Sequence, residues 1–226
     1  MNFTVSASLY RRERTKGVLV NDINQLVEVE TERLADVLDS LDEAGWNTPS
    51  LCAGWRVREV VAHLLMPYQL SAPGFLVKMA AARFDFDRLA ARWATRNGRS
   101  NRDLVDSLRA TAHEKFNVPG APAEAPLSHL IIHSEDIYRP LGTRPVISVD
   151  AANSTLDQTT RRGFVKKGLL DGIALTTTDT GWSIGDGAEG TGSASALITT
   201  IAGRTAALDE LSGNGAGLLS ARLHAG

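Results

Sequence analysis

The sequence predicts a mainly α-helical protein in which a long helical region is followed by a small α/β unit. Up to about residue 165, apolar side chains recur every three or four positions, which is the period of amphipathic helices. After Gly168 the chain changes to short runs rich in threonine, isoleucine and glycine, which favour strands and turns. A chain of 226 residues is long enough for one large and one small unit.

The helical region is predicted to start with a long helix over residues 21–42. Residues 1–19 have no clear apolar period and are interpreted as a flexible lead-in. A second helix follows the turn at residues 48–50, and Pro67 ends or kinks it because proline lacks an amide hydrogen. The buried stripes of the two helices are Ile23, Leu26, Val27, Leu34, Val37, Leu38 and Leu41, then Val57, Val60, Val61, Leu64 and Leu65.

Four further helices are expected before the composition changes. They cover residues 75–96, a segment from Ser100 onward, residues 127–138 and residues 151–167. Asp103, three positions after Ser100, matches a helix-capping signature. These elements place a helical domain at residues 20–165.

The remaining residues, 166–226, are predicted to form the small α/β domain. Residues 173–178 and 182–184 flank the turn Asp179-Thr180-Gly181 and indicate a β-hairpin. The glycine-rich stretch 185–192 is interpreted as a loop. Helices are expected over 193–202 and 205–211, and a short segment over 218–223.

The overall charge and the cysteine content limit the class of protein. A net charge of -2 gives no field that attracts nucleic acid or an anionic membrane, so the expected partners are small molecules. Cys52 is the one cysteine, which excludes an internal disulfide, and no segment resembles a spanning helix or a signal peptide. We therefore expect a cytoplasmic protein, either a monomer or a homodimer.

Two histidines stand four positions apart on one predicted helix. Side chains at positions i and i+4 lie above one another, so His129 and His133 can bind one ion. Zinc binds imidazole nitrogens at about 2.0–2.1 Å, which this spacing permits. The alternative is a pair of surface or half-buried histidines that share a helix face.

His63 is the best candidate for a third ligand. It lies in the last turn of the second helix, and Pro67 cannot bond its carbonyl. An ordinary surface histidine is the alternative. Three histidines and an open position would form a catalytic zinc site, although nickel or iron would also accept these ligands. His113, His224 and Cys52 are not expected to be ligands.

Three stretches carry a family resemblance. Residues 48–64, TPSLCAGWRVREVVAHL, resemble the mycothiol-dependent maleylpyruvate isomerase family within the DinB-like superfamily. Residues 133–142 agree with it, as do residues 178–187 with 202–204, so the resemblance spans about residue 20 to the end. It implies a DinB-like four-helix bundle, an SCP2-like α/β C-terminal domain, a metal on His63, His129 and His133, and mycothiol as cosubstrate in an actinobacterial cytoplasm.

The chain also departs from the family pattern. Close relatives often carry an acidic residue where this chain has His129, which favours metal binding over the specific isomerase activity. Arg56 stands where a small capping residue is common, and is either ligand-facing or solvated. Arg204 resembles a cleft position that pairs with a substrate carboxylate, with an exposed arginine as the alternative. Asp136 either orients an imidazole or pairs with Arg139.

The resulting functional hypothesis is a metal-dependent enzyme that activates a small thiol. Metal coordination deprotonates a thiol at neutral pH. Since Cys52 is a poor candidate, the nucleophile would be mycothiol, used for transfer to, or isomerisation of, a small electrophile. The alternatives are a hydrolase that uses metal-bound hydroxide and a non-catalytic small-ligand-binding protein.

Overall fold

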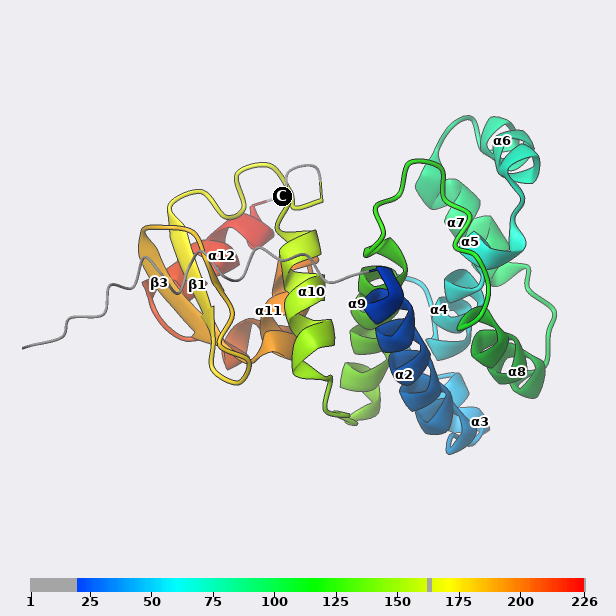
Figure 1. Cartoon of the computed structure of the whole chain (residues 1–226), viewed down its shortest axis with the longest axis horizontal. Coiled ribbons are helices and arrows are strands. Elements are labelled where there is room, and N and C mark those ends of the chain that lie inside the picture. Colours follow the sequence, from blue (N-terminus) through cyan, green and yellow to red (C-terminus); the bar gives the residue numbers. More distant parts are fainter. Residues whose placement is uncertain (1–19, 162–163, 226) are drawn as a thin grey trace, which may run out of the picture.

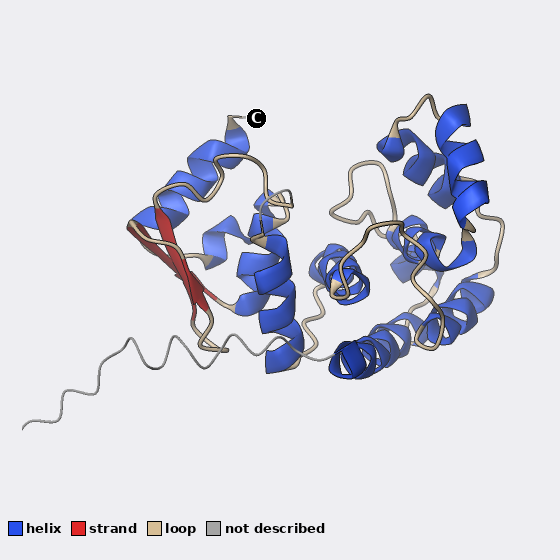
Figure 2. Ribbon diagram, turned by 45° about the horizontal axis from the view of Figure 1, so that its top comes forward, coloured by secondary structure: helices blue, strands red, loops and turns tan. Residues whose placement is uncertain are grey.

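A computed structural model describes residues 20–161 and 164–225, so the predicted lead-in over residues 1–19 lies outside the described residues. The described chain is mainly helical, with one small sheet near its C-terminal end (Figure 1). This confirms the predicted fold class. Figure 2 shows the sheet at one side of the molecule and helices across the rest of it.

Four helices form the bundle that carries the candidate site. They are α2 (Val20–Asp39), α4 (Val57–Leu64), α8 (Asn101–Thr111) and α9 (Ala125–Leu141). Helix α4 packs on α8 and α9, and α2 packs on the same two helices. Their shared core contains Leu34, Leu38, Val57, Val60, Val61, Leu104, Leu108, Leu130 and Ile137, all buried. The apolar stripe predicted for the second helix is therefore its buried face.

A proline and a capping serine mark two of the helix boundaries in the bundle. Helix α4 stops before Leu65, and the short helix α5 (Met66–Gln69) starts immediately with Pro67 in its first turn. The side chain of Ser100 accepts a hydrogen bond from the amide of Asp103, as the capping signature predicted. The short helix α3 (Glu43–Trp46) lies between α2 and the turn at residues 48–50.

The single helix predicted over residues 75–96 is wrong, because the chain forms two helices there. These are α6 (Ala72–Ala81) and α7 (Phe86–Thr95). Arg83 and Phe84 have φ angles of 60° and 61°, which a right-handed helix does not permit. Asp85 then caps α7 by accepting from the amide of Arg88 at 2.9 Å.

Helix α9 continues through Pro140, although its end was predicted before that residue. It stops at Gly142, whose φ of 69° suits glycine. In a regular helix the amide of residue 140 would bond the carbonyl of Asp136, but proline has no amide hydrogen. The amide of Leu51 donates to this carbonyl instead, at 3.1 Å. Pro140 thus leaves an acceptor that docks the loop before α4 onto α9.

The C-terminal region contains a three-stranded sheet in the order β2-β1-β3. The predicted hairpin is present as β1 (Ile173–Thr177) and β2 (Ser183–Ile184), with Leu175 opposite Ile184. The loop predicted over residues 185–192 is wrong, because β3 (Ala188–Gly192) pairs with β1 in parallel. Glycine is needed there for packing: a Cβ on Gly190 would lie 2.9 Å from Leu175 Cδ2.

Helices connect this sheet to the bundle. Helix α10 (Val149–Thr159), shorter than the predicted 151–167, packs against α9 and against α11 (Ala194–Ile201). The 3₁₀ helix η1 (Thr205–Glu210) and α12 (Asn214–His224) complete the unit. One apolar core runs across it, from Ile23, Val27 and Ile131 to Leu156, Ile173 and Leu197. A domain boundary near residue 165 remains a prediction.

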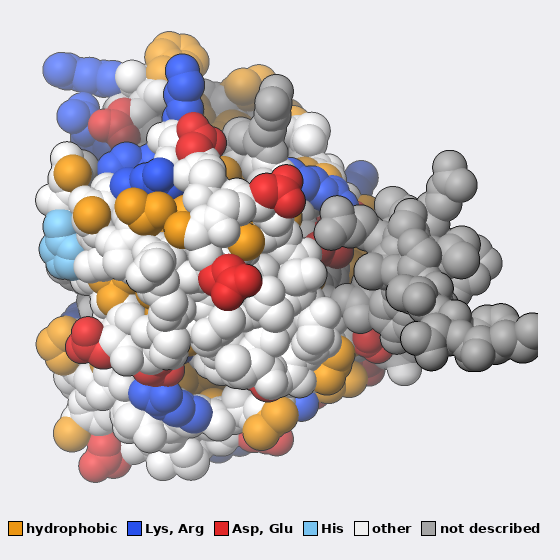
Figure 3. Space-filling view, turned by 90° about the vertical axis from the view of Figure 1, so that its left-hand side faces the viewer, with side chains coloured by type: hydrophobic (Ala, Val, Ile, Leu, Met, Phe, Trp, Pro, Cys, Tyr) orange, Lys and Arg blue, Asp and Glu red, His pale blue; other side chains and the backbone are white. Residues whose placement is uncertain are grey.

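Two further observations concern membrane-spanning helices and the charged surface. None of the described helices combines the length and the apolar character needed to cross a membrane. Figure 3 looks onto the end of the molecule formed by the C-terminal unit, where basic and acidic side chains are interspersed among neutral ones.

Candidate metal centre

The structure brings His63, His129 and His133 together. His63 comes from the last turn of α4, and the other two come from successive turns of α9. The three ring centroids lie 4.8, 4.9 and 5.1 Å apart, and one nitrogen from each ring lies within 4.8 Å of the others. His63 Nε2 and His129 Nε2 are 3.2 Å apart. Nitrogens in a tetrahedral zinc site are about 3.4 Å apart, so this cluster fits a metal.

Burial keeps two of the imidazoles neutral. It lowers the pKa of His63 to about 3, with a smaller contribution from His133. Burial also places the pKa of His129 well below its ordinary value, assisted by the neighbouring His133 and His63. Neutral imidazoles keep the lone pair that a metal ligand needs. Among the described residues, the buried Nδ1 of His63 has no hydrogen-bond partner, which is uncommon for a buried polar atom.

Asp136 sets the orientation of His133. One carboxylate oxygen of Asp136 lies 2.9 Å from His133 Nδ1. Burial acts to raise the pKa of Asp136, but hydrogen bonds from His133 and Arg204 outweigh it and hold that pKa below its usual range. An ionised carboxylate can only accept, so His133 donates from Nδ1 and its Nε2 is left free for a metal. Asp136 was expected either to orient an imidazole or to pair with Arg139, and the structure shows the contact with the His133 imidazole.

Arg204 reaches this carboxylate from the C-terminal unit. Its Nε and Nη2 donate to the two oxygens of Asp136 at 2.8 and 2.7 Å, a two-pronged ion pair. Only 23% of the Arg204 side chain is exposed, so it is not a free surface arginine. Arg139 has other partners: it donates to Glu135 and to Glu210.

Cys52 is a neighbour of the centre that sequence reasoning missed. Its Sγ lies 3.1 Å from an Asp136 oxygen and 3.8 Å from His133 Nδ1. Burial and the nearby Asp136 carboxylate raise the pKa of Cys52 to about 12, so it is a thiol at neutral pH. Cys52, His133 and Asp136 form a second group of close metal donors. The bond that docks the preceding residue, from the Leu51 amide to the Asp136 carbonyl, joins distant parts of the chain and has no local sequence signal.

Aromatic side chains line the histidine cluster. The ring centroids of Trp55 and His63 are 5.1 Å apart, and those of Phe116 and His129 are 5.9 Å apart. Tyr68 packs edge-on against Phe116, and burial raises the pKa of Tyr68 to about 12. These rings make a wall of low polarity, which strengthens electrostatic interactions inside it.

The other candidates lie elsewhere. His113 is exposed, and His224 Nδ1 contacts the carbonyl of Ser220 in α12. Arg56 does not face the cluster, because its guanidinium bonds Glu59 and Asn47. Glu59 in turn accepts from the Arg56 amide at 2.9 Å, which replaces the missing N-terminal cap of α4.

A comparison with protein families gives one match. Residues 27–127 match the family model described as the mycothiol maleylpyruvate isomerase N-terminal domain. These residues belong to that domain family. The matched range of the mycothiol maleylpyruvate isomerase N-terminal domain includes His63, Cys52 and the aromatic wall, whereas His129, His133 and Arg204 follow it. The resemblance noted from residues 48–64 is thus confirmed.

Solved structures extend the likeness beyond the mycothiol maleylpyruvate isomerase N-terminal domain. Crystal structures of the mycothiol-dependent maleylpyruvate isomerase, and of its mutant with a histidine replaced by alanine, each cover 87% of this chain and 93% of their own. In both cases the sequence identity is 17% and the TM-score is 0.53, which shows a shared fold. No curated protein gives a significant match.

Proposed function

We propose that this protein binds a divalent metal, zinc in the first instance, on His63, His129 and His133 and uses it to activate the thiol of mycothiol. The observation that carries this proposal is the convergence of three imidazoles within 4.8 Å of one another, two of them held neutral by burial. The choice of thiol is supported by the family of residues 27–127 and by the fold shared with a mycothiol-dependent maleylpyruvate isomerase.

Each residue of the centre has a definite task in this proposal. A bound divalent cation would supply a Lewis acid that lowers the pKa of a coordinated thiol. His63 and His129 offer lone pairs because burial keeps both rings neutral. Asp136 keeps the Nδ1 proton on His133, so that Nε2 keeps its lone pair for a metal. Trp55 and Phe116 exclude water from the imidazoles.

The reacting thiol would come from a diffusible molecule rather than from the protein. Cys52 is protonated at neutral pH and donates to Asp136. A thiol is a weak nucleophile in that state. The proposed reaction is therefore the mycothiol-assisted isomerisation of a small electrophilic acid, or the transfer of mycothiol to a related electrophile, in the cytoplasm of a mycothiol-producing cell.

Arg204 is the proposed substrate contact. Together with Leu51, Cys52 and Thr205 it lines a cavity of about 400 Å³ between the loop before α4 and the start of η1. A substrate carboxylate in this cavity would compete with Asp136 for the guanidinium, which binds carboxylates through two parallel hydrogen bonds.

The first test is the metal content of purified wild-type protein and single-histidine variants. We expect one equivalent of metal in the wild type and in His113→Ala, because His113 is exposed and belongs to neither group of close metal donors among the described residues. His63→Ala and His129→Ala should lose most of it. Equal metal content in all four proteins would refute the site.

The second test is turnover of maleylpyruvate with and without mycothiol. Turnover that requires both metal and mycothiol supports the proposal. Turnover that requires metal but no thiol would instead indicate a hydrolase with metal-bound hydroxide. Bound metal without any thiol-dependent turnover would indicate a binding protein.

A further inference from the structure

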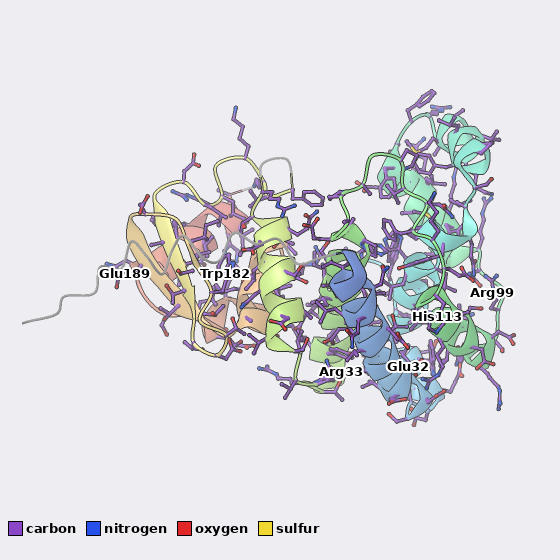
Figure 4. All side chains as sticks on the ribbon, viewed as in Figure 1. Glu32, Arg33, Arg99, His113, Trp182 and Glu189 are labelled. Atoms are coloured by element: carbon purple, nitrogen blue, oxygen red, sulfur yellow. The ribbon has the colours of Figure 1, made fainter. Side chains whose placement is uncertain are left out.

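A second, larger cavity lies against helices α6 and α7. Its volume is about 790 Å³, within the range of about 300–1,000 Å³ that is usual for small-molecule sites. It is lined by α6, α7, the segment that joins α7 to α8, and the first turn of α8. Arg99, on that joining segment, lies at the edge of the molecule opposite the sheet (Figure 4).

One face of α7 forms the floor of this cavity. Leu89, Arg92, Trp93 and Arg96 line it, and their spacing of three, four and seven positions is that of a single helix face. This face combines an apolar surface, from leucine and tryptophan, with two guanidinium groups.

The lining is strongly basic. Lys78, Arg92, Arg96 and Arg99 carry four positive charges, against one negative charge on Asp103. Among the described residues, none of these four cations has a carboxylate oxygen within 4.0 Å, although other arginines of the bundle do. Asp103 is already engaged, since it accepts from the hydroxyl of Ser100 at 2.7 Å. In a chain of net charge -2, this concentration of unneutralised positive charge is a local feature.

Trp93 gives the cavity a fixed aromatic wall. Its indole N–H donates to the Ala62 carbonyl at 3.0 Å, which holds the ring against α4. Lys78 Nζ lies over the ring, 5.8 Å from its centroid, so an ammonium group stands on one face of the indole. A ligand held here would meet cations and a flat apolar surface together.

We propose that this cavity binds a phosphorylated small molecule, with its phosphate on the arginines and its ring or apolar part against Trp93. Three of the four cations are arginines, whose planar guanidinium matches phosphate through paired hydrogen bonds. The net lining charge of four cations less one carboxylate suits a dianion. The site shares no residue with the histidine cluster.

The test is calorimetric titration of the full chain with phenyl phosphate and with inorganic phosphate. We expect saturable binding of phenyl phosphate, tighter than that of inorganic phosphate because of the ring contact with Trp93. Arg96→Ala and Lys78→Ala should each weaken phenyl phosphate binding about tenfold or more. The matched control is Arg102→Ala on the outer face of α8, where the side chain is 90% exposed and pairs only loosely with Asp106.

Three outcomes would overturn the inference. They are no saturable binding at millimolar concentration, equal weakening in Arg102→Ala and Arg96→Ala, and phenyl phosphate binding no tighter than inorganic phosphate. Lys78, Arg96 and Arg102 are all exposed, so their variants should fold, and an unchanged circular dichroism spectrum checks this. Metal content should be unaffected by all three substitutions.

Discussion

Replacing Asp136 tests how the candidate centre is held in place. The Asp136 side chain is 1% exposed, and it accepts from Arg204 on both oxygens, from His133 and from Cys52. In Asp136→Asn the amide group would face one of the Arg204 donors and leave a largely buried guanidinium without its charge partner. Breaking a buried ion pair in this way costs about 3 kcal/mol or more. We expect Asp136→Asn to lower the free energy of unfolding by about 3 kcal/mol and not much more, because part of Arg204 is exposed to water.

A measurement of metal affinity separates the effect of Asp136 on the orientation of His133 from its effect on folding stability. Loss of the carboxylate that orients a metal-binding histidine reduces affinity about 10- to 100-fold. Asp136→Asn should reduce metal affinity about 10-fold, because its amide oxygen can still accept from His133. Asp136→Ala should reduce it about 100-fold. Arg204→Met should destabilise the fold to a similar degree yet retain more metal affinity than Asp136→Ala, since the contact between Asp136 and His133 remains.

The assays are urea unfolding for the free energy and competition with a chromophoric chelator for zinc affinity. The reasoning is refuted if Asp136→Ala binds zinc as tightly as the wild type, or if Arg204→Met weakens zinc binding as much as Asp136→Ala does.

Three further predictions follow from the same contacts. Burial lowers the pKa of His63 from 6.5 in the unfolded chain to about 3 in the folded protein. Between these pH values the unfolded state therefore binds more protons than the folded state. The metal-free protein should lose stability as the pH falls below about 6.5, by up to about 4 kcal/mol near pH 3. Urea unfolding at stepped pH measures this loss, which His63→Phe should reduce. His129→Glu should keep bound metal whereas His129→Ala loses it, because a carboxylate is also a zinc ligand; metal analysis would contradict this if both variants were empty. Cys52→Ala should retain thiol-dependent turnover, since the Cys52 thiol is protonated; complete loss of turnover in a folded variant would show that the protein thiol reacts.

The sequence could predict features that depend on local spacing. His129 and His133 lie one helix turn apart, so their shared face follows from the helix period alone. His63 was proposed from the helix end at Pro67 and from the family resemblance, because its approach to α9 depends on the packing of α4. Cys52 was not proposed, and Arg204 was proposed from the resemblance only as a substrate contact. The two residues lie 84 and 68 positions from Asp136, so only tertiary structure joins them to it.

Two of the errors of secondary structure have similar causes. No glycine marks the break between α6 and α7, where Arg83 and Phe84 take the left-handed conformation that non-glycine residues rarely adopt. The stretch 185–192 resembles a loop because it is rich in glycine, yet Gly190 and Gly192 serve close packing of β3 in the sheet, against Leu175 and Leu211. In both places long-range packing overrides the local preference of the residues.

The bond between Arg204 and Asp136 also bears on how such a protein can be assembled from parts. All three histidines lie before residue 134, whereas Arg204, which neutralises the Asp136 carboxylate that orients His133, lies near the end of the chain. During synthesis the bundle emerges before Arg204 can pair with Asp136, and the centre is complete only after the C-terminal unit has docked. A gene fusion that transferred the bundle alone would therefore pass on the histidines without the arginine that completes the centre.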